Sequence, residues 1–163
     1  METLYLEKTS EIKKSRLLLE NKLEIKMEVF RNRVSIEGEA IKEYEATRVL
    51  EAMGLGFSAH KALKLLEQDT LFRKINIKEF TRRKDLRDVK SRVIGKEGKT
   101  KATIENLTDC EIVISENSVG IIGEALSIDE AVTAIKNIIR GTKQANAYKY
   151  LEKMNAIRKE LSG

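Results

Sequence analysis

Apolar and charged residues alternate along several short stretches of the chain, and each stretch predicts a strand with one buried face. The first stretch is residues 23–29, where leucine, isoleucine, methionine and valine alternate with charged residues. Residues 31–33 then predict a hairpin turn, and residues 34–36 predict the partner strand. Between Ala40 and Ala52 the apolar residues recur at helical spacing. The predicted unit is strand, turn, strand, helix.

The same pattern returns 85 residues further along. It predicts strands at residues 110–114 and 119–122 around a turn at 116–118, and a helix at 127–140 that begins with a capping box of Ser127 and Glu130. An ungapped shift of 85 gives eleven identities among the 37 positions from 20 to 56. Because two copies are too few for a solenoid, we infer a duplicated domain.

Upstream of the second copy, residues 72–80 predict its first strand. Residues 86–94 space their apolar side chains like one helix face, Gly95 ends that helix, and residues 100–107 predict another. The order in the second copy is strand, helix, glycine turn, helix, strand, strand, helix, which is an α+β fold class.

The first copy and the remaining segments are predicted more simply. Residues 2–6 predict a strand that runs almost directly into a helix, and Leu17 to Leu19 are expected in the core. Residues 58–66 predict a short connecting helix, and residues 144–161 a C-terminal helix.

Composition narrows the class of protein. No apolar run approaches the ~20 residues of a membrane span, and the first residues do not resemble a signal peptide. The single cysteine, Cys110, excludes an internal disulfide and reads most simply as a buried side chain of a strand. The only histidine, His60, is expected on a helix surface. These features predict a cytoplasmic protein.

Positive charge is concentrated in one segment. Residues 82–101 contain nine Lys or Arg and three Asp or Glu, whereas the rest of the chain has 22 basic and 23 acidic residues. Such a segment is often only a solvated face, but against a neutral remainder it favours a local contact with a polyanion. Arg82, Arg83 and Lys84 begin it, either as a solvated turn or as contacts to an RNA backbone.

Within this segment, Gly95-Lys96-Glu97-Gly98 separates two predicted helices. Alone, the two glycines are also consistent with a helix end followed by a new helix start. Glycines allow a sugar–phosphate backbone to approach closely, and the next helix start offers free N–H groups to phosphate. Beside the loop, apolar side chains of the second helix and the following strand predict a shallow groove for about four single-stranded nucleotides. The predicted RNA-contact residues are Arg92, Val93, Ile94, Gly95, Lys96, Glu97, Gly98, Lys99, Thr100, Lys101, Ile104, Ile112, Val113 and Ile114.

Two sets of residues resemble a known family. The run from Val93 to Thr100, followed by Ile104-Glu105, resembles the signature of the type I KH domain. Residues 54–66, the segment 119–123 and the tail 147–152 resemble archaeal Pno-type (partner-of-Nob) rRNA-processing proteins. The resemblance covers about residues 20 to 155.

This resemblance implies two tandem type I KH domains, each a three-stranded antiparallel sheet with helices on one face. The implied division is a KH-like domain at 1–57, a helical linker at 58–70, a KH domain at 71–142 and a helix at 143–163. It also implies binding of single-stranded rRNA near the 3′ end of the small-subunit rRNA. Implied partners are a Nob-type endonuclease and the alpha subunit of initiation factor two.

The first copy departs from the KH signature. At the offset of 85, the loop glycines fall on Ser10 and Lys13, whose side chains block close approach of a phosphate backbone. We expect a degenerate module there, with a packing or protein-contact role. No nucleophile–base pair or phosphate-binding loop of the nucleotide hydrolases stands out, so we expect no enzyme and no cofactor. A protein-interaction adaptor with weak RNA binding, and a KH protein of RNA decay or translation, stay open as alternatives.

Overall fold

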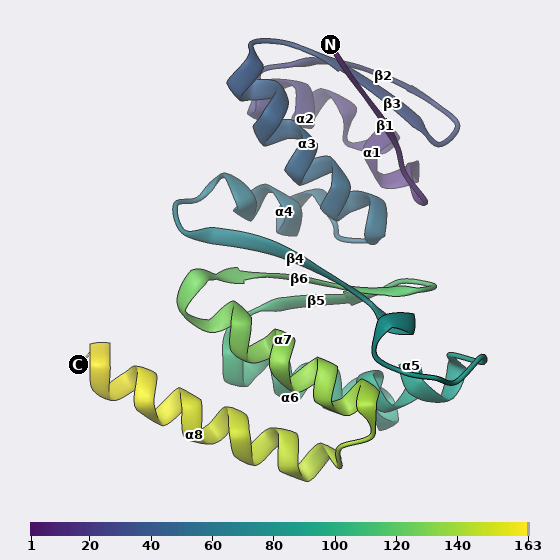
Figure 1. Cartoon of the computed structure of the whole chain (residues 1–163). Coiled ribbons are helices and arrows are strands. Elements are labelled where there is room, and N and C mark those ends of the chain that lie inside the picture. The colour runs from purple at the N-terminus through teal and green to yellow at the C-terminus, as the bar shows by residue number, and fades with distance from the viewer. Residues whose placement is uncertain (163) are drawn as a thin grey trace. The chain divides into compact units, whose positions relative to one another are not determined.

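The chain folds into two compact units. A computed structural model describes residues 1–162, of which Met1–Phe72 form the first unit and the second begins at Arg73. Each unit contains a three-stranded sheet and several helices (Figure 1). The α+β class predicted from the sequence is confirmed. Within residues 1–162, no helix is both long and apolar enough to cross a membrane.

The first unit builds its sheet in the order β1-β3-β2, with antiparallel neighbours. Along β2 and β3 burial alternates, so that Met27, Val34 and Ile36 point into the core while Lys26 and Glu28 are exposed. This period of two is what the alternation of apolar and charged residues predicted. The elements are β1 (Glu2–Tyr5), α1 (Ser10–Lys14), α2 (Arg16–Leu23), β2 (Lys26–Phe30), β3 (Arg33–Glu37), α3 (Ala40–Leu55), α4 (Ala59–Ala62) and the 3₁₀ turn η1 (Leu63–Leu66).

The end of the first unit packs on α3. Both α4 and η1 contact this helix, and the rings of Phe57 and Phe72 meet edge to face with centroids 6.4 Å apart. Arg48 on α3 donates to the carbonyl of Thr70 at 3.2 Å. His60 is exposed on α4, as expected.

The second unit repeats this order of elements and adds a long helix. Its sheet has the order β4-β6-β5, and β4 begins in the last three residues of the first unit, 70–72. The central strand β6 is buried from Ser118 to Gly123. Cys110 is buried immediately before β5, which confirms its predicted burial. The elements are β4 (Thr70–Asn76), the 3₁₀ turn η2 (Ile77–Glu79), α5 (Arg87–Ile94), the 3₁₀ turn η3 (Lys96–Gly98), α6 (Lys99–Thr108), β5 (Glu111–Ile114), β6 (Ser118–Glu124), α7 (Ala125–Arg140) and α8 (Gln144–Ser162).

The two units share individual contacts at the offset of 85 residues. In the first, Glu20 on α2 accepts a hydrogen bond of 3.0 Å from the backbone N–H of Met27 on the edge strand β2. In the second, Glu105 on α6 accepts one of 3.0 Å from the N–H of Ile112 on the edge strand β5. Each carboxylate also pairs with a cation one helical turn earlier, Arg16 at 3.3 Å and Lys101 at 3.2 Å.

These matching contacts tie a helix to the free edge of each sheet, where an unpaired N–H otherwise needs a partner. The same offset relates Gly56 and Gly141, which end α3 and α7 at φ values of 126° and 118°. The likeness of the two copies therefore extends to the order of elements, the order of strands and single hydrogen bonds.

Three sequence expectations are wrong. The strand predicted at residues 72–80 spans Thr70–Asn76, and the 3₁₀ turn η2 follows it. The predicted capping box fails because α7 begins at Ala125, which places Ser127 inside the first turn, where its hydroxyl donates to the carbonyl of Glu124 at 3.5 Å. Glu130 instead bonds Arg158 of α8 at 2.7 Å. Of the three leucines expected in the core only Leu19 is buried, whereas Leu17 is 82% exposed and Leu18 is 45% exposed.

Candidate nucleic-acid interface

The loop between α5 and α6 is a single tight turn. Helix α5 ends at Gly95, whose φ is 79°, and the N–H of Gly98 closes the turn by donating to the carbonyl of Gly95 at 3.1 Å. Glu97 and Gly98 also have positive φ values, 55° and 74°. Three residues of four thus adopt left-handed backbone, which favours glycine and is strained for Glu97.

The two glycines have different surroundings. A Cβ on Gly95 would collide with the hydroxyl and the backbone nitrogen of Thr100 in the first turn of α6. A Cβ on Gly98 would meet no atom of the described residues within 4 Å. Gly95 is therefore required by packing, while Gly98 leaves its side of the loop open to solvent and to a ligand.

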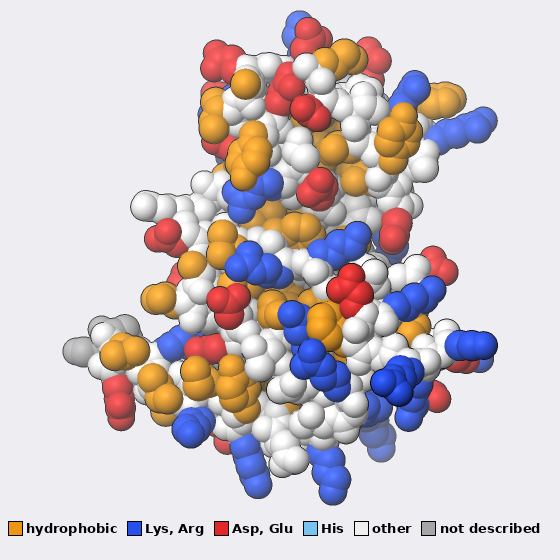
Figure 2. All heavy atoms as spheres, viewed as in Figure 1, with side chains coloured by type: hydrophobic (Ala, Val, Ile, Leu, Met, Phe, Trp, Pro, Cys, Tyr) orange, Lys and Arg blue, Asp and Glu red, His pale blue; other side chains and the backbone are white. Residues whose placement is uncertain are grey.

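Helix α6 begins at this open side. Its N-cap residue is Gly98, which supplies no side-chain cap, so the first amides of the helix have no side-chain acceptor at the cap position. Such amides, with the positive end of the helix dipole, favour an anion such as phosphate. Lys96 and Lys99 are exposed beside them and form no ion pair within residues 1–162. Figure 2 shows Lys and Arg side chains gathered at this end of the second unit.

Burial divides the predicted RNA-contact residues into two groups. Four of the predicted residues are at most 3% exposed, so they cannot contact RNA directly and instead support the surface from beneath. They are Val93, Thr100, Ile104 and Ile112. Ile94 is 37% exposed, and Val113 and Ile114 on β5 are half-buried. The exposed or half-exposed members are Arg92, Ile94, Gly95, Lys96, Glu97, Gly98, Lys99, Lys101, Val113 and Ile114.

Polar groups also occupy the surface between α6 and β5. Lys101 is 31% exposed in its side chain and is held by Glu105, which also accepts the N–H of Ile112. The surface beside the loop, where the sequence predicts a groove, therefore carries an ion pair as well as apolar side chains. Glu105 belongs to the KH-like signature, and its structural role depends on contacts with Ile112 and Lys101 that the sequence pattern does not show.

The start of α8 fixes both flanks of the loop, which the sequence did not indicate. Gln144 donates to the carbonyl of Arg92 at 3.0 Å and to the hydroxyl of Thr100 at 3.2 Å. The hydroxyl of Tyr148 donates to the same oxygen of Thr100 at 3.1 Å. The guanidinium of Arg92 in turn donates to the carbonyl of Thr142 at 2.8 Å, which directs it toward the α7–α8 junction.

The basic residues before α5 lie in an exposed loop. Arg82, Arg83 and Lys84 are all exposed, and Arg83 approaches Asp88 at 3.8 Å. Further along, hydrogen bonds from the side chain and then the backbone N–H of Arg87 lower the pKa of Asp85 from 3.8 to about 2. Asp85 therefore remains charged at neutral pH and is compensated by Arg87.

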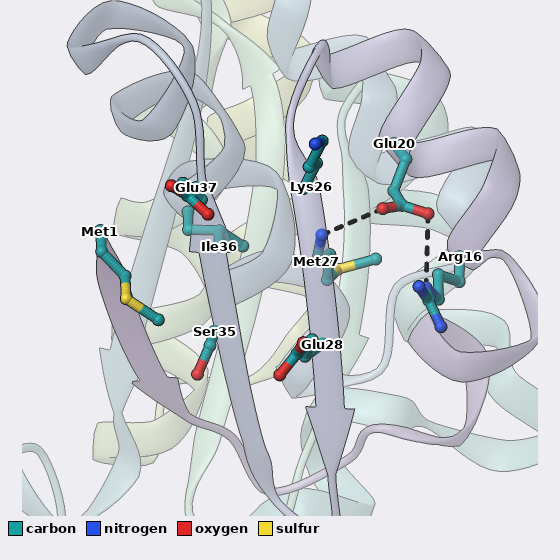
Figure 3. A pocket seen from close by; sticks show the side chains of 9 residues that line it. All are labelled: Met1, Arg16, Glu20, Lys26, Met27, Glu28, Ser35, Ile36 and Glu37. Atoms are coloured by element: carbon teal, nitrogen blue, oxygen red, sulfur yellow. Dashed lines mark hydrogen bonds and ion pairs between the residues drawn. The ribbon is translucent and has the colours of Figure 1, made fainter.

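The corresponding place in the first unit has no loop. Ser15 alone joins α1 to α2, with φ −99°. Nearby is a pocket of about 340 Å³ whose lining mixes acids and bases, and Figure 3 shows Glu20 reaching from α2 toward both Met27 and Arg16. The lining residues are Met1, Arg16, Glu20, Lys26, Met27, Glu28, Ser35, Ile36 and Glu37.

A comparison with family models identifies the second unit. Residues 71–156 match the model for the second KH domain of PNO1, described as a eukaryotic-type KH domain, KH-domain type I. The chain belongs to this PNO1-type KH-domain family. The matched residues run from β4 into α8, so the model covers one KH domain of this PNO1-type chain and leaves the first unit outside it.

Curated relatives of this PNO1-type chain come from archaea and eukaryotes. A KH domain-containing protein of Methanocaldococcus jannaschii is 32% identical over 142 residues, which cover 83% of this chain and 63% of the relative. A pre-rRNA-processing protein pno1 of Emericella nidulans is 31% identical over 123 residues, covering 68% of this chain and 45% of the relative. The chain thus spans less than two thirds of the length of these relatives.

Solved structures share the fold of most of this chain. Dim2p from Pyrococcus horikoshii is 26% identical, with a TM-score of 0.84 over 93% of this chain and 98% of that one. A complex of a/eIF2alpha, aDim2p and rRNA from the same organism contains a chain that is 24% identical, with a TM-score of 0.86 over 96% of this chain and 94% of that one. At 24% identity, the similarity to the chain in this complex shows a shared fold.

Proposed function

We propose that this chain is a non-catalytic RNA-binding factor that grips single-stranded RNA with the loop Gly95–Gly98 of its second unit. The observation that carries the proposal is the open side of Gly98 at the start of α6, beside Lys96 and Lys99, which form no ion pair among residues 1–162. A sugar–phosphate chain can rest on the backbone there, and its phosphate oxygens can accept hydrogen bonds from the first amides of α6. Ile94, Val113 and Ile114 then offer apolar surface to splayed bases.

The biological role that we propose is assembly and processing of the small ribosomal subunit. Support comes from the family match and from the relative described as a pre-rRNA-processing protein. The proposed target is single-stranded rRNA near the 3′ end of the small-subunit rRNA. Crosslinking in cells followed by sequencing of the bound RNA tests this choice, because recovery of mRNA in place of rRNA precursor would favour a role in decay or translation.

Two protein partners are part of the proposal. The alpha subunit of initiation factor two is supported by the complex in which a chain of the same fold is joined to that subunit and rRNA. A Nob-type endonuclease follows from the resemblance to partner-of-Nob proteins. The first unit is proposed to be a degenerate KH domain, supported by its matching order of elements and by the replacement of the loop by Ser15.

The proposed role of the loop is tested by the double substitution Lys96→Asp and Glu97→Asp. It replaces the cation of Lys96 with a carboxylate and keeps the carboxylate that position 97 already carries, so binding of single-stranded RNA at moderate salt should fall about a hundredfold or more. A matched control is Lys78→Asp with Glu79→Asp, the same dipeptide exposed in η2. Fluorescence anisotropy should show the loss for the loop variant alone, and equal affinities of the two variants would contradict the proposal.

A second candidate function is a protein-interaction adaptor with weak RNA binding. The exposure of Leu17 and Leu18 on α2 favours it, because large apolar side chains on a surface often mark contacts with other proteins. A salt series separates the two functions. The adaptor predicts that RNA affinity disappears at physiological salt, whereas the RNA-binding factor retains part of its affinity through stacked bases.

A further inference from the structure

The β2–β3 hairpin of the first unit presents an aromatic ring beside two cations. Phe30 ends β2 and is 61% exposed. The guanidinium carbon of Arg31 lies 5.4 Å from the centre of its ring, and that of Arg33 lies 5.8 Å away. Among residues 1–162, no carboxylate lies within ion-pair distance of either guanidinium. The ring therefore keeps most of its surface exposed although two guanidinium groups lie over it.

Contacts within the unit hold this hairpin in place. The hydroxyl of Thr9 donates to the carbonyl of Arg31 at 2.6 Å, and the N–H of Leu6 donates to the carbonyl of Asn32 at 2.8 Å. Phe30 and Arg33 are direct partners in the register of β2 and β3. A pocket of about 280 Å³ adjoins the ring, and its lining consists of Arg16, Glu28, Val29, Phe30, Arg33 and Ser35. In Figure 2, blue and orange side chains lie together at the tip of this hairpin.

The second unit lacks these groups at the matching positions. At the offset of 85, Phe30 corresponds to Ser115, Arg31 to Glu116 and Arg33 to Ser118. The aromatic and basic tip is therefore no general feature of the duplicated fold. The loop Gly95–Gly98 shows the reverse distribution, because the second unit has it and the first does not.

We propose that the hairpin tip Phe30–Arg33 is a second binding site for single-stranded RNA. A base stacks on the exposed ring of Phe30, while Arg31 and Arg33 contact the phosphates on either side of that base. An acidic protein segment would use the two cations but gains little from an exposed flat ring, whereas a nucleobase stacks on such a ring. The inference rests on the proposed function in that both sites take RNA, but it involves other residues of the chain.

The absence of tryptophan from the chain allows a direct test. The variant Phe30→Trp places one fluorophore at the proposed stacking position, and a stacked base quenches indole emission. We expect saturable quenching on titration of the full chain with a single-stranded RNA of about 20 nucleotides. The matched control is Tyr44→Trp, at an exposed position on α3, which should keep its emission. Unchanged emission of the Phe30→Trp variant at RNA concentrations that saturate binding by anisotropy would overturn the inference.

Further measurements test whether the hairpin tip binds RNA or an acidic peptide, and whether its residues contribute to RNA affinity. Polyglutamate should leave the emission of the Phe30→Trp variant unchanged. Equal quenching by polyglutamate, or equal quenching of the Tyr44→Trp control by RNA, would overturn a stacking site. Phe30→Leu, and separately Arg31→Gln with Arg33→Gln, should each weaken RNA binding about fivefold or more.

One further titration separates the hairpin site from the proposed function of the loop. It uses the Phe30→Trp variant with Lys96→Asp and Glu97→Asp added. If the loop substitutions leave RNA affinity unchanged and the quenching persists, the proposed function is contradicted and the hairpin site is still supported. If the loop substitutions abolish RNA binding of the otherwise unaltered chain and the Phe30→Trp variant shows no quenching, the hairpin site is overturned and the proposed function stands.

Discussion

Gly95 and Gly98 illustrate, at the scale of single residues, how one motif serves two purposes. Both have positive φ, but only Gly95 is enclosed, since Thr100 occupies the space that a Cβ would need. The hydroxyl of Thr100 is itself bonded by Gln144 and Tyr148, so it cannot move aside without breaking those bonds. The first glycine therefore stabilises the fold, and the second gives access to the backbone.

This difference predicts opposite outcomes for two substitutions. Gly95→Ala should lower the free energy of unfolding by about 2 kcal/mol or more, from left-handed strain together with overpacking against Thr100. Gly98→Asn should cost less than about 1 kcal/mol, because asparagine tolerates left-handed backbone and the site is open. It should nevertheless weaken RNA binding by adding a side chain at the contact. Urea unfolding and anisotropy measure the two effects, and equal losses of stability would contradict the assignment.

The ionisation of Asp85 is a second prediction at this scale. Hydrogen bonds from Arg87 lower the pKa of this carboxyl to about 2. Because that value lies below the ordinary 3.8, the contact stabilises the folded state above pH 3.8 and is lost as the pH falls through 2. Carbon-detected NMR should give a titration midpoint near 2, and Arg87→Gln should raise it. A midpoint at 3.8 in the unaltered chain would refute the assigned contact.

Among the elements, α8 has the largest role that the sequence did not reveal. Its first turns contact the flanks of the loop, and its later turns contact α7 through Arg158 and Glu130 at 2.7 Å. Arg158 also donates to the carbonyl of Leu107 at the end of α6 at 3.0 Å. Helix α8 therefore links the helices on both sides of the candidate interface.

The hydrogen bond from Tyr148 to Thr100 predicts that α8 affects RNA binding by holding the first turn of α6 in place. Tyr148→Phe removes one hydrogen bond to the first turn of α6, and RNA affinity should fall severalfold while the melting temperature changes little. The control is Tyr150→Phe, which alters a half-buried tyrosine of the same helix. If both variants bind RNA as tightly as the unaltered chain, α8 does not position the loop.

The pair of Arg158 and Glu130 predicts an effect on stability. Glu130 is 7% exposed, so Arg158→Met leaves a buried carboxylate without its partner, and we expect a loss of about 3 kcal/mol in the free energy of unfolding. Combining it with Glu130→Gln should recover part of that loss, because the buried charge is removed as well. A double variant less stable than the single one, measured by urea unfolding, would contradict this account.

Elements were predictable where the pattern of apolar residues is local. Period-two alternation located β2 and β3, and helical spacing located α3 and α5, because these patterns follow from which face is buried. The exposure of Leu17 and the failure of the capping box at Ser127 were not predictable, since both depend on what the fold places nearby. For the same reason the sequence identified the loop at Gly95 but not the residues of α8 that hold it.

The two units of the molecule share a framework and differ in the chemistry of their surfaces. The paired contacts of Glu20 and Glu105 remain in both units, because each closes the edge of its own sheet. The parts suited to RNA differ, with the glycine loop in the second unit and the aromatic hairpin at Phe30 in the first. A fold can keep its framework while each copy presents different chemistry on its surface.

In the proposed complex, single-stranded RNA lies on the backbone of the loop Gly95–Gly98. Amide chemical shifts followed by NMR during titration with single-stranded RNA reveal whether it does. We expect the largest shifts at the N–H groups of Gly98 and Lys99, with smaller shifts at Val113 and Ile114 on β5. Saturated RNA binding that leaves the amides of Gly98 and Lys99 unshifted would contradict this placement of the RNA.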